Sequence, residues 1–189
     1  MDQIYAPWRI EWVERDADPI DGCPFCVLPD REDARDARIV ARSERNYVLL
    51  NNAPYNPGHA MVIPREHHED PTDLDDATLL DHAKLKTATL AALRRDVDPD
   101  GINAGQNLGG SAAGGSVDHL HTHVVPRWDG DTNFMPVTSD TKVIVEAIDR
   151  TYEHLHAGFA AGDDVVDAGD AAAGDAVEIE FGVAVDGDD

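Results

Sequence analysis

The segment HLHTHVVP, residues 119–126, places three histidines at every second position: His119, His121 and His123. Because side chains of a β-strand alternate between its two faces, this spacing predicts that the three imidazoles share one face while Leu120 and Thr122 take the other. Successive rings would then stand about 6.5–7 Å apart, a separation that lets two of them flank a phosphate-sized group. A solvated strand face or a fortuitous metal patch would explain one such histidine, but three at strict alternation favour a chemical site.

A glycine-rich loop, NLGGSAAGGSVD (residues 107–118), comes directly before the histidines. Glycine lets backbone N–H groups approach an anionic ligand closely, although a glycine loop alone often forms only a tight turn. A neutral imidazole, with an ordinary pKa of about 6.5, is a competent nucleophile near neutral pH. Its attack on phosphorus would form a covalent intermediate, and a neighbouring protonated histidine could offset charge on the phosphoryl oxygens. Loop and histidines together predict phosphate binding beside a nucleophile or base.

The motif HLHTHVV resembles the HφHφHφφ signature of the histidine triad (HIT) superfamily, with Thr122 as a polar departure at one φ position. The resemblance continues in LLNNAPYNPGHAMVIPREH (residues 49–67) and covers roughly Tyr5 to Val137. The stretches APWR (6–9) and VVPRWDGDTNFMPV (124–137) look most like the branch that cleaves dinucleoside polyphosphates, which includes diadenosine tetraphosphate phosphorylases and hydrolases. The resemblance implies an α+β HIT-like fold, an antiparallel sheet of about five strands with helices packed on it, in a homodimer.

The same resemblance implies nucleotidyl transfer from a nucleotide polyphosphate, with water or inorganic phosphate as the acceptor. His121 would be the nucleophile, His123 would hold the α-phosphate, and Ser116 would contact the leaving group. His59 matches the histidine that supports the ring of the nucleophile. Asn51 would otherwise be a turn-forming residue, and Ser116 a loop hydroxyl. Two other functions stay open, a nucleoside phosphoramidase with the same histidines and a non-catalytic nucleotide sensor. The substrate-binding residues implied by the resemblance are Asn51, Asn107, Gly114 and Gly115.

The sequence CPFC contains the only two cysteines, Cys23 and Cys26. A CxxC pair supplies half of a tetrahedral zinc site, but it also suits a redox dithiol or buried structural thiols. Zinc-bearing HIT proteins complete such a site with the first triad histidine and a histidine after the VIP strand. Here these positions are His119 and His67, and the resemblance therefore implies a structural Zn²⁺ on Cys23, Cys26, His67 and His119. His68 is an adjacent residue whose side chain should point elsewhere.

Short β-favouring runs at 38–42, 46–51, 59–64, 101–107 and 119–126 predict the sheet. A helix after the third run has Thr72 as its predicted N-cap. Its predicted stripe runs through Leu79, Ala83, Lys86 and Leu90 and is widened by Leu80 and Leu93. A second helix is predicted over residues 141–155. We expect a HIT domain at 1–156, with a zinc half-site segment at 1–37 and a core at 38–156. The acidic segment 157–189 is expected to be a disordered tail, although VEIEFGVAV (177–185) alternates like a strand.

The formal net charge is −23, from 38 acidic and 15 basic residues. Such a surface repels nucleic acids and anionic membranes, so neither is an expected partner. Abundant aspartate and scarce lysine are typical of proteins from a salt-loaded cytoplasm, where molar salt shortens the Debye length to roughly 3 Å. We therefore expect a halophilic, cytoplasmic protein. The absence of an apolar signal-peptide region at the N-terminus and of any run of about 18 apolar residues supports that expectation.

Overall fold

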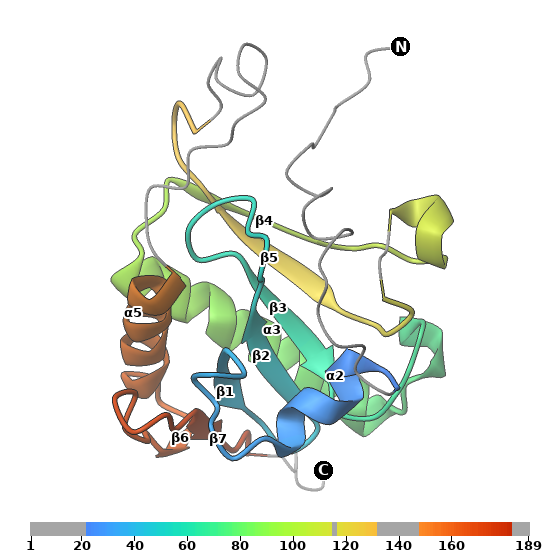
Figure 1. The fold of residues 1–189 in the computed structure, drawn as a ribbon, viewed down its shortest axis with the longest axis horizontal. Coiled ribbons are helices and arrows are strands. Elements are labelled where there is room, and N and C mark those ends of the chain that lie inside the picture. Colours follow the sequence, from blue (N-terminus) through green and yellow to red (C-terminus); the bar gives the residue numbers. More distant parts are fainter. Residues whose placement is uncertain (1–21, 115–116, 132–147, 183–189) are drawn as a thin grey trace, which may run out of the picture.

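The computed structural model describes residues 22–114, 117–131 and 148–182. These residues form a seven-stranded sheet in the order β4-β5-β3-β2-β1-β7-β6, with helices on both faces (Figure 1). The fold class is α+β, as expected, and the sheet has two strands more than predicted. The strands are β1 (Ile39–Arg42), β2 (Asn46–Leu50), β3 (Ala60–Pro64), β4 (Gly101–Gln106), β5 (Thr122–Arg127), β6 (Val165–Asp167) and β7 (Val177–Ile179).

Strands β1 to β5 pair with one another antiparallel and follow the five predicted runs. Their alternating side chains divide the interior into two cores. Val48 and Val62 face the long helix α3 (Asp76–Asp96), whereas Tyr47 and Ile63 face the short N-terminal helix α2 (Pro24–Val27). Helix α5 (Ile148–Ala160) packs beside α3, and Figure 1 shows α2 on the opposite side of the sheet.

The beginning of α3 differs from the prediction. Its N-cap is Asp75, whose side chain accepts a hydrogen bond from the backbone N–H of Thr78 at 2.7 Å. Thr72 instead lies in the separate 3₁₀ helix η3 (Pro71–Asp73), which is capped by Asp70. Leu74 between the two helices is extended, so a helix cannot run continuously from Thr72. The Thr72 prediction is therefore wrong.

The buried face of α3 also differs from the predicted apolar stripe. Leu79 and Leu80 are 45% and 52% exposed, while the polar residues Thr78, His82 and Thr89 are buried. The helix is rotated from the expected orientation, and its buried polar side chains are satisfied. His82 bonds to Asn46 and Thr122 on the sheet, Oγ1 of Thr78 accepts from Arg45, and Thr89 donates to the carbonyl of Leu85 in the same helix.

The C-terminal segment is not a disordered tail as far as residue 182, and this expectation is wrong. Strand β7 pairs in parallel with β1, and β6 pairs antiparallel with β7. Val177 and Ile179 are buried in the α3-side core, whereas Glu180 remains exposed. The alternating residues of β7 thus bury Val177 and Ile179 in the core, and this burial attaches the acidic C-terminal segment to the sheet. The start of the predicted second helix, at residues 141–147, lies outside the described residues. Residues 183–189 also lie outside them.

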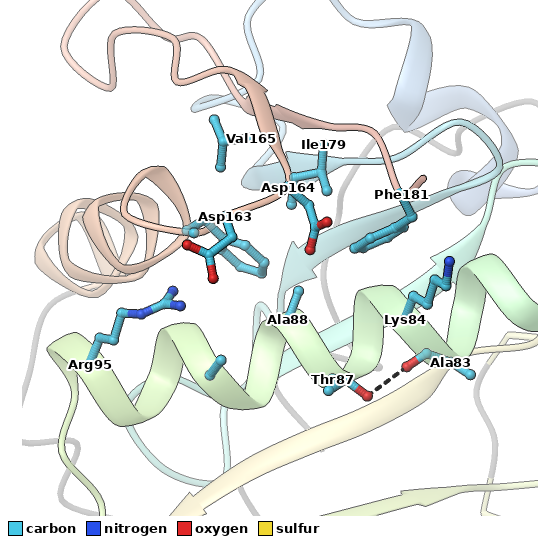
Figure 2. A pocket seen from close by; sticks show the side chains of 13 residues that line it. Ala83, Lys84, Thr87, Ala88, Arg95, Asp163, Asp164, Val165, Ile179 and Phe181 are labelled. Atoms are coloured by element: carbon cyan, nitrogen blue, oxygen red, sulfur yellow. Dashed lines mark hydrogen bonds between the residues drawn. The ribbon is translucent and has the colours of Figure 1, made fainter. Parts of the chain in front are cut away.

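A cavity of about 470 Å³ lies between α3 and the C-terminal strands. Figure 2 shows Lys84 and Phe181 at one end of it and Arg95 at the other. Lys84 Nζ donates to the carbonyl of Gly182, and Arg95 donates to the carbonyl of Gly158. The cavity is therefore on the α3 side, away from the face that carries the histidine motif. In the described ranges, no helix is long and apolar enough to cross a bilayer.

Candidate functional site

Five histidines form a continuous row of rings on the α2 side of the sheet. Ring centroids are 4.9 Å apart for His67 and His119, 4.8 Å for His121 and His123, and 5.1 Å for His123 and His59. Phe25 of α2 stands edge-on between His119 and His121, with centroid distances of 5.7 and 5.4 Å. We call this set the histidine row: His67, His119, His121, His123 and His59.

Alternation places the triad as predicted, although its strand begins later. Thr122 and Val124 face α3, so His121 and His123 face the other way. Strand β5 starts at Thr122, three residues after the predicted start. His119 and His121 therefore precede the regular ladder of β5. Between these two histidines, the N–H of Leu120 donates to the carbonyl of His68 at 2.6 Å.

One end of the row is a candidate metal centre. The potential ligand atoms of Cys23, Cys26, His67 and His119 all lie within 4.8 Å of one another. Nδ1 of His119 is 3.3 and 3.5 Å from the two sulfurs, and Nδ1 of His67 is 3.5 Å from Cys26 Sγ. Tetrahedral bonds of about 2.0–2.3 Å give ligand–ligand edges of about 3.3–3.8 Å, so the donor set fits a tetrahedral dication. His68 is not a member of this cluster.

The protonation of the cluster also fits a metal site. Burial, together with the neighbouring Cys23 thiol, raises the pKa of Cys26 to about 11. Burial likewise lowers the pKa of His119 to about 4, so its ring is neutral. Nε2 of His119 is 2.9 Å from the carbonyl of Pro64 and must carry the proton, which leaves the Nδ1 lone pair directed at the sulfurs. A bound metal ion would compensate the charge of these two half-buried thiolates.

His121 is held in one tautomer by the main chain. Its Nδ1 lies 2.7 Å from the carbonyl oxygen of His119, and a carbonyl can only accept. The proton of a neutral His121 ring is therefore on Nδ1, and Nε2 carries a lone pair. The ring is 7% exposed, so most of it is shielded from water. This arrangement suits a nucleophile whose attacking nitrogen must be unprotonated.

His59 contacts His123, and its predicted support of the His121 ring stays a prediction. Its Nε2 is 3.0 Å from Nδ1 of His123, and its Nδ1 accepts the backbone N–H of Tyr55 at 3.1 Å. A neutral His59 therefore carries its proton on Nε2 and donates it to Nδ1 of His123. His123 in turn carries its proton on Nε2. Met61 pairs with His123 across β3 and β5, and this register brings His59 beside the third triad residue.

The loop that carries Tyr55 is fastened to the end of β5. Asn56 donates to Asp131 at 2.9 Å and to the carbonyl of Pro126 at 2.8 Å. Arg127 binds both carboxylate oxygens of Asp131, at 2.5 and 2.8 Å. The hydrogen bond from Arg127 holds the pKa of Asp131 well below its usual range, so the carboxylate stays charged. These contacts fix the loop beneath His59.

The remaining predicted site residues are placed only in part. Asn51 Oδ1 accepts the N–H of Ala53 at 2.8 Å, so this asparagine forms the turn that the sequence also allowed. Asn107 follows β4 and is half-buried, and Gly114 has a φ of +83° with open space around its Cβ position. Ser116 and Gly115 lie outside the described residues.

Two aromatic residues of the site were not predicted from the sequence. Phe25 packs against His119 and His121, and Tyr55 stacks on His59 with centroids 4.9 Å apart at 14°. The central position of Phe25 in CPFC is the one available signal for its role. The hydroxyl of buried Tyr47 also donates to the carbonyl of Phe25 at 2.7 Å, which anchors α2 on the sheet.

Comparison with known proteins agrees with this geometry. A model of the HIT domain matches residues 32–130. The chain is 39% identical over 163 residues to a protein named AP-4-A phosphorylase from Mycobacterium tuberculosis, a match that covers 80% of each chain. It is 32% identical over 105 residues to adenosine 5'-monophosphoramidase of Schizosaccharomyces pombe, covering 56% of this chain and 74% of that one. A Zn-bound histidine triad protein from Mycobacterium smegmatis is similar in structure, with a TM-score of 0.58, 28% identity, and coverage of 74% and 94%.

Proposed function

Because the chain belongs to the HIT domain family, we propose that it cleaves nucleotide polyphosphates at the α-phosphate through a covalent nucleotidyl-His121 intermediate. The observation that carries this proposal is the bond between Nδ1 of His121 and the carbonyl of His119, which leaves Nε2 with its lone pair. The substrate is a dinucleoside polyphosphate such as diadenosine tetraphosphate. The similarity to a protein named AP-4-A phosphorylase favours inorganic phosphate over water as the acceptor.

In the first step Nε2 of His121 attacks the α-phosphorus. A P–N bond forms while the P–O bond to the leaving polyphosphate breaks, and the leaving oxygen keeps the electron pair. That oxygen belongs to a terminal phosphate, which is stable as an anion near neutral pH, so its departure requires no proton. His123, with its proton on Nε2, donates to a non-bridging oxygen and offsets the developing charge.

In the second step an oxygen of inorganic phosphate attacks the same phosphorus. The P–N bond breaks, its electron pair returns to Nε2 of His121, and a nucleoside diphosphate is released. Asn51 and Asn107, with Gly114 and Gly115, are proposed to hold the nucleotide, and Ser116 to contact the leaving group. Dividing one displacement into two lowers the barrier of each step.

We propose that the metal at Cys23, Cys26, His67 and His119 is zinc and that it is structural. Four protein ligands complete a tetrahedral shell and leave no open position for a substrate. When bound, zinc stabilises both thiolates. His119 then fixes the peptide whose carbonyl orients His121.

We also propose a homodimer in a cytoplasm of high salt. Strand β4 is the edge of the sheet and is exposed along nearly its whole length, and an exposed edge readily pairs with another strand. Pairing of two β4 edges would continue the sheet between protomers. A monomeric mass by sedimentation equilibrium at 2 M KCl would refute this part of the proposal.

The proposed function is tested with diadenosine tetraphosphate in the presence and absence of phosphate. A phosphorylase yields ADP and ATP, a hydrolase yields AMP and ATP, and phosphoramidase activity appears with an adenosine phosphoramidate, as the similarity to the Schizosaccharomyces pombe enzyme suggests. Mass spectrometry of protein that is quenched without acid should locate the nucleotidyl adduct on His121. His121→Ala should abolish both turnover and adduct, while His154→Ala on α5 should retain them. Full turnover by His121→Ala would refute the mechanism.

A further inference from the structure

A buried polar chain runs behind the catalytic strand, on the face that α3 covers. Oγ1 of Thr122 lies 2.7 Å from Nε2 of His82 on α3 and 2.8 Å from Nε2 of Gln106 on β4. Nδ1 of His82 lies 2.8 Å from Oδ1 of Asn46 on β2. Thr122, His82 and Asn46 are all 5% exposed or less. Three different elements are therefore connected to the residue between His121 and His123.

The partners fix the direction of every bond in the chain. Nδ2 of Asn46 is 2.7 Å from the carboxylate of Asp81, so its Oδ1 faces His82 and accepts the Nδ1 proton of that ring. Burial lowers the pKa of His82 to about 4, and the ring is neutral at ordinary pH. Its Nε2 therefore accepts the hydroxyl proton of Thr122. The Thr122 oxygen accepts in turn from the amide of Gln106.

A threonine at this position needs more explanation than packing. Valine would fill the same volume without burying a hydroxyl, and a buried polar group is costly unless its hydrogen bonds are made. His121 immediately precedes the first ladder residue of β5, which is Thr122. Thr122 pairs with Val62 on one side and with Gln106 on the other. Its hydroxyl is thus an anchor for the first regular residue after the nucleophile.

We propose that the Thr122 hydroxyl, held by His82 and Gln106, is a positioning group that fixes the main chain between His121 and His123 and so directs Nε2 of His121. This inference rests on the proposed function for its kinetic consequence. It assigns no contact with substrate to Thr122 or His82. Removing the hydroxyl should lower kcat and the rate of adduct formation while KM changes little, because the nucleotide-binding groups stay in place.

The variant Thr122→Val is compared with Thr122→Ser and Thr89→Val. Thr89 is fully buried on α3 and bonds to the carbonyl of Leu85, so Thr89→Val removes an equally buried hydroxyl away from the catalytic strand. We expect kcat to fall about 10- to 100-fold in Thr122→Val with KM within about twofold. Thr122→Ser and Thr89→Val should keep kcat near the wild-type value. Equal kcat losses in Thr122→Val and Thr89→Val, or none in Thr122→Val, would overturn the proposal.

The double variant Thr122→Val/His82→Leu separates positioning from simple satisfaction of buried polar groups. It removes the hydroxyl together with its acceptor but leaves Oδ1 of buried Asn46 without its donor, so we expect the midpoint of thermal unfolding to equal that of His82→Leu alone. The kcat defect should persist, because β5 still lacks its anchor to α3. Wild-type kcat in the double variant would show that the two groups only satisfy each other, and would overturn the proposal.

A spectroscopic readout separates this proposal from the proposed function. In ¹⁵N spectra of the histidine rings, wild-type His121 should be a single tautomer protonated on Nδ1. Thr122→Val should give a mixture of tautomers, and Thr89→Val should not. If the wild type shows no turnover but the tautomers change as described, the proposed function fails and the positioning role stands. An unchanged His121 spectrum in Thr122→Val refutes the positioning role whatever the activity.

Discussion

Loss of the metal should loosen one end of the catalytic site without unfolding the domain. We consider Cys23→Ser, which removes one of four ligands. The α3-side core does not include the cluster, so most of the buried apolar surface is untouched. A metal whose Kd is about 1,000-fold below its free concentration contributes about 4 kcal/mol to the free energy of unfolding. Since 1 kcal/mol shifts the melting temperature of a chain this long by about 2–4 °C, the expected loss is about 8–16 °C.

The same variant should reduce catalysis. His119 would lose its anchor at Nδ1, although Nε2 still bonds to Pro64, and its carbonyl would orient His121 less well. Changes in such supporting groups typically cost about 10- to 100-fold, and we expect kcat to fall within that range.

The assay combines elemental analysis, thermal unfolding and kcat for Cys23→Ser, the wild type and a control. His68→Ala is the matched control, because His68 neighbours a ligand yet lies outside the cluster. We expect about one metal per chain in the wild type and in His68→Ala. Cys23→Ser with full metal content and an unchanged melting temperature would refute the assignment.

Three further predictions concern stability. Because burial lowers the pKa of His82 to about 4 in the folded protein, the unfolded chain binds a proton first as pH falls. This ring should therefore lower the free energy of unfolding by up to about 3 kcal/mol between pH 6.5 and pH 4, and in urea titrations the pH dependence of His82→Leu should be smaller than that of the wild type by this amount. Gly158→Ala should cost about 1–3 kcal/mol, because its Cβ would lie 2.6 Å from the carbonyl of Ala92, whereas Gly101→Ala meets nothing within 4 Å; equal urea midpoints would contradict this. With a net charge of −23, the melting temperature should rise between 0.1 and 2 M KCl, and a flat or falling profile would remove the basis for halophily.

The sequence predicted those elements of the fold that depend on neighbouring residues in the chain. Strands β1 to β5 were predicted to within a few residues because period-two alternation is a property of neighbouring side chains. The face of α3 was missed because Thr78, His82 and Thr89 look solvent-facing until their hydrogen-bond partners are known. Strand β6 was missed because an acidic composition dominated the few apolar residues of the segment, whereas β7 lies within VEIEFGVAV, whose alternation is typical of a strand.

The candidate site likewise has parts that could be predicted from the sequence and parts that could not. The CxxC pair and the triad can be recognised from spacing, and the structure brings Cys23, Cys26 and His119 together with His67 as predicted. The contact of His59 with His123 could not be predicted, because it depends on the register between β3 and β5. Register is set by pairing across about sixty residues of intervening chain, and no local pattern specifies it.

The His121 ring is held from both of its chain neighbours, and by two different layers of the fold. On the N-terminal side, the carbonyl of His119 bonds to Nδ1 of His121, and His119 is itself held by Pro64 and the cysteines. On the C-terminal side, Thr122 is bonded to α3 through His82. Since α2 and α3 lie on opposite faces of the sheet, neither anchor alone determines the rotation of the strand about its own axis. We infer that both anchors are needed to hold the imidazole of His121 in one tautomer and one direction. This would explain why the chain at the start of β5 makes buried polar contacts on both faces of the sheet, although the neighbouring strand β4 is exposed.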